Sequence, residues 1–198
     1  MDEVIVIPNE ETNSLKECFE RLKKGCETLS EECNYSEDYS KFNPPATEEQ
    51  IKEYEREFKF PLPEAYREFL KFSNGARIMG EDIYGLDMIG LDDPFVPDGY
   101  LAISQLESTS ERMAISENDG EIYLCWDLKP SSWSFDREIK SLLNECEDII
   151  DEHNREIEKE ERRKAGITPE QEYEMILERI KAAKKKIAEK RKVNYKQR

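Results

Sequence analysis

The segment 60–75, FPLPEAYREFLKFSNG, and the residues just before it constrain the fold more than any other part of the chain. The run TEEQ from Thr47 to Gln50 is a capping box, in which the Thr47 hydroxyl accepts the Gln50 backbone N–H and the Gln50 side chain reaches back. Pro61 ends the helix that follows, because proline lacks an N–H and biases the preceding residue away from helical angles. Asn74-Gly75 is a stop for the next helix. The pattern predicts a helix–turn–helix corner of a hydrophobic core.

This corner also carries a family resemblance. Its order of Leu-Pro, Tyr, Phe-Leu and Asn-Gly is supplied by Leu62, Pro63, Tyr66, Phe69, Leu70, Asn74 and Gly75. A second, less specific match runs from Met113 to Asp127 and contains a turn signal at Asn118-Asp119-Gly120. Together the two stretches resemble the signature of the SUKH superfamily (the Smi/Knr family) over about half of the chain. The resemblance implies structural roles for the seven corner residues and for Gly120.

The pattern after Gly75 changes to short strands separated by turns. The candidate strands are 77–79, 83–86, 101–103, 113–115 and 121–126. Helices followed by a run of strands are typical of an α+β fold. We therefore expect a SUKH-like α+β core with a mostly antiparallel or mixed sheet packed against helices.

Helical patterns flank this core on both sides. Thr12 or Asn13 can cap a first helix that runs to about Glu32, and a polar linker follows it. Beyond residue 135 a long apolar stripe is interrupted at Gly166 and resumes after a second capping box, which predicts a C-terminal α-helical hairpin extension. The expected segments are 1–46 for the N-terminal helix and linker, 47–135 for the core and 136–198 for the extension.

The charge of the chain is unevenly distributed. The formal net charge is −16, and by count residues 1–135 carry −17, residues 136–178 carry −8 and residues 179–198 carry +9. Such an acidic body repels nucleic acid and attracts basic partners. The basic C-terminal run favours a solvated helix end, although it could also bind RNA or fold against the acidic body.

The apolar segments exclude a membrane-spanning class. No apolar run approaches the ~20 residues that a transmembrane helix needs. The start of the chain, MDEVIVIPNEE, has acidic flanks and only a short apolar patch from Val4 to Ile7, so it does not read as a signal peptide. A cytoplasmic location is the expectation, with no membrane partner.

Motifs for catalysis or metal binding do not occur in the sequence. There is no phosphate-binding glycine loop and no G-x-S-x-G. The one histidine, His153, lies on an apolar helical stripe, and the five cysteines include no CxxC pair. We expect Cys18, Cys26 and Cys146 to be buried free thiols, and we expect no enzyme activity, no cofactor and no metal site.

Acidic and aromatic residues gather between residues 81 and 100. This cluster can be an ordinary solvated surface or a docking face, where carboxylates pair with basic groups and aromatic rings provide anchors. A calcium site is disfavoured because the EF-hand order is absent. The two tryptophans can pack at the core edge or serve as interface anchors. The candidate partner-binding residues are Glu81, Asp82, Tyr84, Asp87, Asp92, Asp93, Asp98, Tyr100, Trp126 and Asp127.

The resemblance implies a function as well as a fold. Many bacterial SUKH proteins are non-enzymatic immunity proteins that bind and neutralise a cognate toxin, often a nuclease. A basic nuclease-type toxin suits the acidic body of this chain. The alternative is a regulatory or scaffold adaptor of the Smi/Knr type, with the C-terminal helices closing on each other or forming a homodimer.

Overall fold

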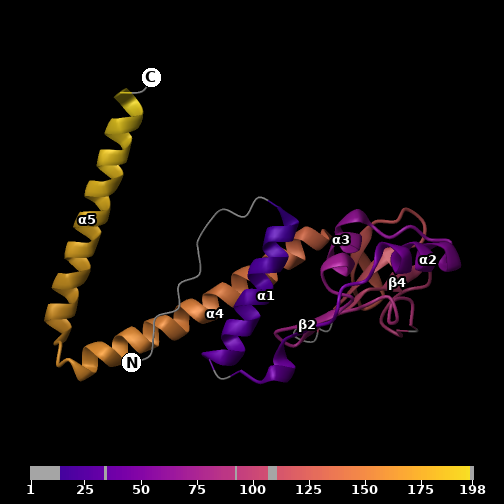
Figure 1. Ribbon diagram of the computed structural model, residues 1–198, viewed down its shortest axis with the longest axis horizontal. Helices are drawn as coiled ribbons and strands as arrows, with labels where there is room; N and C mark the ends of the chain where they lie inside the picture. Colours follow the sequence, from indigo (N-terminus) through magenta and orange to yellow (C-terminus); the bar gives the residue numbers. More distant parts are fainter. Residues whose placement is uncertain (1–13, 34, 92, 107–110, 197–198) are drawn as a thin grey trace. The chain divides into compact units, whose positions relative to one another are not determined.

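The computed structural model describes residues 14–33, 35–91, 93–106 and 111–196 (Figure 1). The predicted patch Val4–Ile7 and the predicted caps Thr12 and Asn13 lie outside these residues. The described chain forms two compact units, residues 14–153 and residues 154–196. Among the described residues, no helix is both long and apolar enough to cross a membrane.

The helices begin at the capping signals of the sequence. They are α1 (Leu15–Glu31), the short 3-10 helix η1 (Glu37–Tyr39), α2 (Glu48–Phe58), α3 (Glu64–Phe72), α4 (Phe135–Lys164) and α5 (Pro169–Lys196). The predicted cap of α1 at Thr12 or Asn13 is wrong, because Ser14 caps this helix through a capping box with Glu17. The predicted Thr47–Gln50 box caps α2. Helix α2 ends before Pro61, because Lys59 already adopts a left-handed conformation with φ 54°.

The strands form two antiparallel sheets. The first has the order β1 (Lys41–Phe42), β2 (Ala76–Ile78), β3 (Glu81–Ile83) and β5 (Ser104–Gln105). The second has the order β4 (Tyr100–Ala102), β6 (Arg112–Ser116), β7 (Ile122–Trp126) and β8 (Lys129–Ser132). The prediction of an α+β fold with C-terminal helices is confirmed, whereas β1, β5 and β8 were not predicted.

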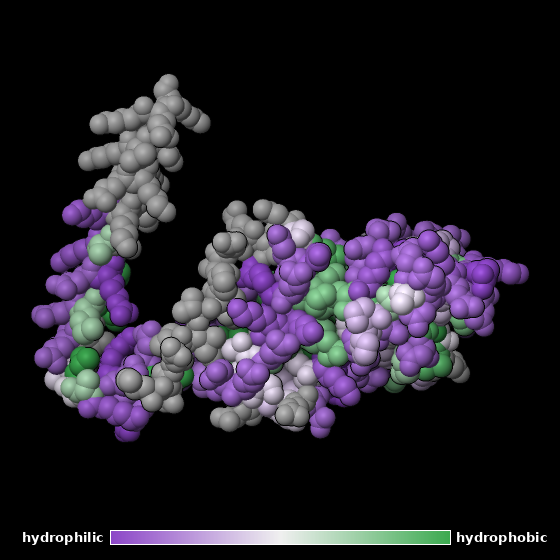
Figure 2. Space-filling model, in the orientation of Figure 1, coloured by the Kyte–Doolittle hydropathy of each residue, from purple (hydrophilic) through white to green (hydrophobic). Residues whose placement is uncertain are grey.

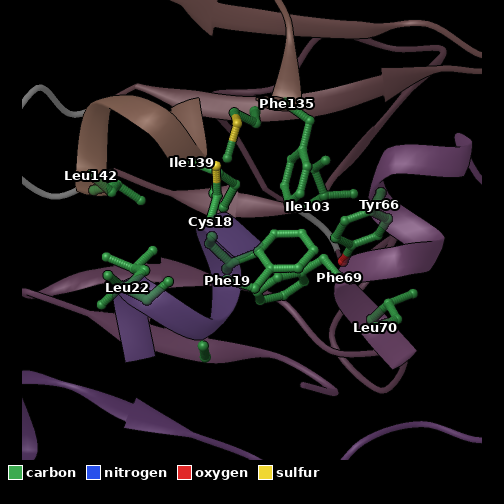
Figure 3. Close-up of a cluster of buried hydrophobic side chains, with 14 of the residues drawn as sticks. Cys18, Phe19, Leu22, Tyr66, Phe69, Leu70, Ile103, Phe135, Ile139 and Leu142 are labelled. Atoms are coloured by element: carbon green, nitrogen blue, oxygen red, sulfur yellow. The ribbon is translucent and has the colours of Figure 1, made fainter. Parts of the chain in front are cut away.

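The core joins helices that are far apart in the sequence. The ring of Phe19 on α1 lies 5.5 Å from Phe69 on α3, and Phe69 lies 5.6 Å from Phe135 at the start of α4 (Figure 3). Apolar side chains from all three helices surround these rings, among them Cys18, Leu22, Tyr66, Leu70, Ile139 and Leu142. Helix α1 and the first part of α4 therefore belong to the same core as the corner α2–α3.

The Asn74-Gly75 signature fixes the loop that leaves β3. Helix α3 ends at Phe72, so Asn74-Gly75 lies just beyond the helix and leads into β2. The Asn74 side-chain oxygen accepts the Leu86 N–H at 2.8 Å. Gly75 has φ 84°, and a Cβ there would lie 2.6 Å from the backbone nitrogen of Gly85. Two backbone segments thus approach each other at a distance that only glycine permits.

The second unit presents apolar side chains on α5. Tyr173, Met175, Ile176 and Ile180 are exposed, and α5 shows apolar patches between hydrophilic ones (Figure 2). Ala165–Thr168 separate α5 from α4, with Gly166 in a left-handed conformation of φ 68°. Both predicted C-terminal helices are present.

A buried carboxyl in α4 gives a testable pH dependence. Burial raises the pKa of Glu138, and the Trp133 indole N–H that donates to its carboxylate at 3.1 Å opposes the shift only in part. A carboxyl with a raised folded-state pKa stabilises the fold most when it is protonated, and this contribution is lost as pH rises through the folded pKa. We expect Glu138→Gln to raise the melting temperature at pH 7, because the amide stays neutral and can still accept the indole N–H.

The gain from Glu138→Gln should shrink as pH falls through the ordinary carboxyl range, where Glu138 itself becomes neutral. Thermal unfolding of wild type and variant at matched pH values measures this difference. Glu152→Gln, at an exposed position of the same helix, is the control and should show no comparable gain. A Glu138→Gln gain that did not depend on pH would contradict the electrostatic explanation.

Candidate functional site

A groove of about 270 Å³ lies on the outer face of the first sheet and collects three of the predicted binding residues. Asp82 lies on β3, opposite Arg77 of β2. Tyr84 is the first residue after β3, and Asp87 lies in the loop that follows. The groove also contains Lys41, Arg77 and Met88, so its lining combines both charge signs with aromatic and apolar surface.

The strand register explains the charged lining. Lys41 is paired with Arg77, and Arg77 is paired with Asp82, so these residues form one row across β1, β2 and β3. The Arg77 guanidinium lies 3.9 Å from the Asp82 carboxylate. The buried Tyr66 hydroxyl donates to the Tyr84 carbonyl at 2.6 Å, which ties the groove to the core. The residues of the corner signature thus support the groove.

A second group of acids and tyrosines lies on the second sheet. Tyr100 on β4 packs edge-on against Tyr123 on β7, with ring centroids 5.4 Å apart. The Tyr123 hydroxyl donates to Asp119 at 2.9 Å, and the Glu117 N–H donates to the Gly99 carbonyl at 2.8 Å. The exposed residues Asp98, Glu117, Asp119 and Glu121 therefore surround two partly buried tyrosine rings.

We call this second group the acid–tyrosine ridge, defined as Asp98, Tyr100, Glu117, Asp119, Glu121 and Tyr123. The hydrogen bond from the Glu121 backbone N–H, and after it the one from the Tyr123 hydroxyl, lower the pKa of Asp119. This carboxylate therefore stays ionised. Only Asp98 and Tyr100 were predicted as binding residues. The other four follow from the antiparallel pairing of β4, β6 and β7, of which the sequence revealed only the turn at Asn118–Gly120 between β6 and β7.

Two of the predicted binding residues lie inside the fold. Glu81 is buried on β3. Asp93 accepts the Arg112 guanidinium N–H at 2.8 Å, and the two side chains are only 13% and 9% exposed. The Phe95 ring lies 5.2 Å from the same guanidinium. Asp93 thus holds the loop after β3 against β6. The predicted residue Asp92 lies outside the described residues.

Trp126 and Asp127 lie at the tip of the β7–β8 hairpin. Trp126 is 66% exposed, which excludes core packing for this tryptophan. Trp133 instead is half-buried, with the Arg137 guanidinium 4.7 Å from its ring. Asp127 and Leu128 have φ values of 50° and 59°, as in a type I′ turn. Leu128 is exposed beside Trp126, so the tip offers an apolar contact surface.

Three of the described cysteines have thiols with raised pKa values. Burial raises the pKa of Cys18 and Cys33, and it raises the pKa of Cys125 to about 11. These thiols are therefore protonated at neutral pH and are weak nucleophiles. Among the described residues, no group of three or more His, Cys, Asp or Glu side chains is arranged to hold a metal ion.

Comparison with protein families identifies a match over the central part of the chain. The model of the SMI1 / KNR4 family (SUKH-1) matches residues 45–152. The match includes the corner α2–α3, both sheets except β1, and the part of α4 that packs on the core. Helix α1, which completes that core, lies outside it. No curated protein matches the chain.

Proposed function

Because this chain belongs to the SMI1 / KNR4 family (SUKH-1), we propose that it is an immunity protein that binds a basic protein toxin and neutralises it by covering its working surface. The observation that carries the proposal is the repeated pairing of exposed carboxylates with partly buried tyrosines. Asp87 and Tyr84 line the same groove, and Asp98 precedes Tyr100 by two residues on the acid–tyrosine ridge. The chain contributes affinity and shape, and no chemical step is required of it.

The electrostatics of the body support a basic partner. The negative charge of residues 1–135 would attract a cationic protein to the groove and the acid–tyrosine ridge and would speed their association. Toxins that cleave nucleic acid carry basic surfaces, since they bind phosphate backbones. Partly buried tyrosines then provide rigid anchors with little loss of side-chain entropy. Trp126 at the hairpin tip would add a third contact.

Charge reversal tests this proposal. The tagged full chain is used as bait in extracts of the native host, with washes at low and high salt and mass spectrometry as readout. We expect a single basic toxin-like partner, and we expect Asp87→Lys/Asp98→Lys to reduce its recovery at least tenfold, because both substituted positions are exposed on the proposed face.

A matched control separates local from global charge. Asp148→Lys/Glu152→Lys changes the net charge by the same amount at exposed positions of α4 and should leave recovery unchanged. Equal losses in the two double variants would mean that only net charge matters. Full recovery with Asp87→Lys/Asp98→Lys would remove both the groove and the ridge from the interface.

The exposed apolar side chains of α5 favour a second candidate function. As a regulatory or scaffold adaptor, the chain would use Tyr173, Ile176 and Ile180 to bind a helix of another protein or of a second copy. In that case recovery of the partner would survive Asp87→Lys/Asp98→Lys and would be lost with Ile176→Glu/Ile180→Glu. Cell-wall, signalling or self-association partners in the same capture would also favour the adaptor.

A further inference from the structure

Two thiols from different helices meet between α1 and α4. Cys26 is 3% exposed, Cys146 is fully buried, and both are free. The side chains of Cys26 and Cys146 interact with each other, and the Ser40 side chain also interacts with Cys26. These interactions lower the pKa of Cys26, against the effect of burial, and the contact raises the pKa of Cys146. The pair is therefore asymmetric, and Cys26 is the readier thiolate.

Gly25 brings the two helices close together at this point. A Cβ on Gly25 would lie 2.6 Å from the Cys146 sulfur and 3.9 Å from the Cys146 Cβ. The backbone of α1 therefore passes close to the Cys146 side chain, and Cys26 is the next residue along that helix. The side-by-side course of α1 and α4 is visible in Figure 1.

A surface pocket gives small molecules access to one of the two thiols. Its volume is about 320 Å³, and its lining includes Cys26, Lys23, Ser40 and Phe42 but not Cys146. This volume is many times the roughly 30 Å³ that a water molecule occupies in the liquid. Hydrogen peroxide, which is little larger than water, can therefore approach Cys26 through this pocket, whereas Cys146 does not line it.

We propose that Cys26 and Cys146 form a peroxide-sensitive thiol pair, in which the thiol facing the pocket is oxidised first and the buried thiol then closes a disulfide between α1 and α4. In the first step the Cys26 thiolate attacks one peroxide oxygen, the O–O bond breaks, and Cys26 sulfenic acid and hydroxide form. In the second step the Cys146 sulfur attacks the sulfenic sulfur, the S–O bond breaks, and water leaves with the Cys146 proton. Two thiols and one peroxide thus give one disulfide and two waters.

The other cysteines lack this combination of features. Cys18 lies on the same buried face of α1, but burial raises the pKa of its thiol and it does not line the pocket. Cys125 lies on β7, and its pKa is raised to about 11. The reaction is therefore expected to be selective. It is independent of the proposed toxin binding, because neither thiol belongs to the groove, the ridge or the hairpin tip.

The experiment treats the reduced, folded full chain with hydrogen peroxide, quenches it, and labels the remaining thiols with an alkylating reagent after denaturation. We expect two of the five thiols to be lost, with a mass lower by two hydrogen atoms, and non-reducing peptide mapping to join Cys26 to Cys146. The oxidised protein should melt at a higher temperature, since the disulfide closes a long loop. Cys18→Ser, on the same helix face, should behave like the wild type.

Other results would overturn the proposal. They are unchanged Cys26 and Cys146 after oxidation of the folded chain, pairing of either residue with Cys18, Cys33 or Cys125, or a sulfinic acid on Cys26 without a disulfide. Peptide mapping of the wild type decides among these outcomes, so no variant has to fold. Where Cys146→Ser does fold, Cys26 should be trapped as a sulfenic acid that a dimedone-type probe labels.

Discussion

Gly75→Ala is expected to lower the free energy of unfolding by about 3 kcal/mol or more, because it imposes two separate costs. Gly75 has φ 84°, a conformation that costs an L-residue about 1–2 kcal/mol. The new Cβ would also lie 2.6 Å from the Gly85 nitrogen and 3.2 Å from the Ile83 carbonyl oxygen. Both neighbours are backbone atoms, so relief requires movement of the loop after β3. Urea unfolding followed by tryptophan fluorescence measures the loss.

Two other glycines separate the two costs. Gly120 has φ 73° with no atom near the position of a Cβ, so Gly120→Ala should lose only about 1 kcal/mol. Gly85 lacks a left-handed φ, but its Cβ would lie 2.5 Å from the Asn74 carbonyl oxygen, so Gly85→Ala should show the steric cost alone. If Gly75→Ala and Gly120→Ala were equally stable, the close approach of the two backbones would not matter.

Asp93→Ala is expected to destabilise the fold by about 3 kcal/mol, because it leaves the Arg112 charge buried without its carboxylate. The same change at Asp98, an exposed acid of the ridge, should stay within about 0.5 kcal/mol. Thermal and urea unfolding of the two variants compares them directly. Asp93 therefore has to be left intact in any search for binding residues, since its loss would reduce binding by unfolding the face.

A double variant shows whether the cost belongs to the unpaired charge. Asp93→Ala/Arg112→Met removes both charges and should be more stable than Asp93→Ala alone, because no charge is left buried. The Phe95 ring, which now contacts the guanidinium, can pack against the methionine. A double variant less stable than Asp93→Ala would show that the Arg112 side chain has a packing role of its own.

Local signals in the sequence predicted most of the framework. The Thr47–Gln50 capping box, the break at Pro61 and the turn at Asn118–Gly120 each act within a few residues, so the structure reproduces them. The apolar period of α1 also predicted its buried face, including Phe19 and Leu22. The sequence did not reveal that this face packs on α3 and α4, since that contact joins residues far apart in the chain.

The strands β1, β5 and β8 were not predicted, and each omission has a physical reason. β1 and β5 have two residues each, too few to show an alternating pattern. β8 reads Lys-Pro-Ser-Ser, a composition typical of a loop. The turn before it, Asp127-Leu128, has positive φ values at both residues without a glycine, so the usual hairpin signal is absent.

The candidate site was predicted in part. Exposed acids such as Asp87 and Asp98 were found because charge density is visible in the sequence. Burial of Glu81 and pairing of Asp93 with Arg112 depend on tertiary contacts. The sequence pattern therefore does not distinguish these two acids from their exposed neighbours. Tyr123 was missed as a binding residue because its proximity to Tyr100 arises only when β4, β6 and β7 assemble.

Hydrogen bonds hold the loop after β3 at two points. Asn74 accepts the Leu86 N–H, and Arg112 donates to Asp93. Between these two points Asp87, Met88 and Leu91 are exposed, so their side chains can change without disturbing either attachment, whereas Ile89 is buried in the core. A protein built in this way can change its partner by small steps, since new surface chemistry arises on a frame that keeps its stability. Substitution of these three exposed positions, with Ile89 kept, would accordingly make a practical starting point for designing binders with altered specificity.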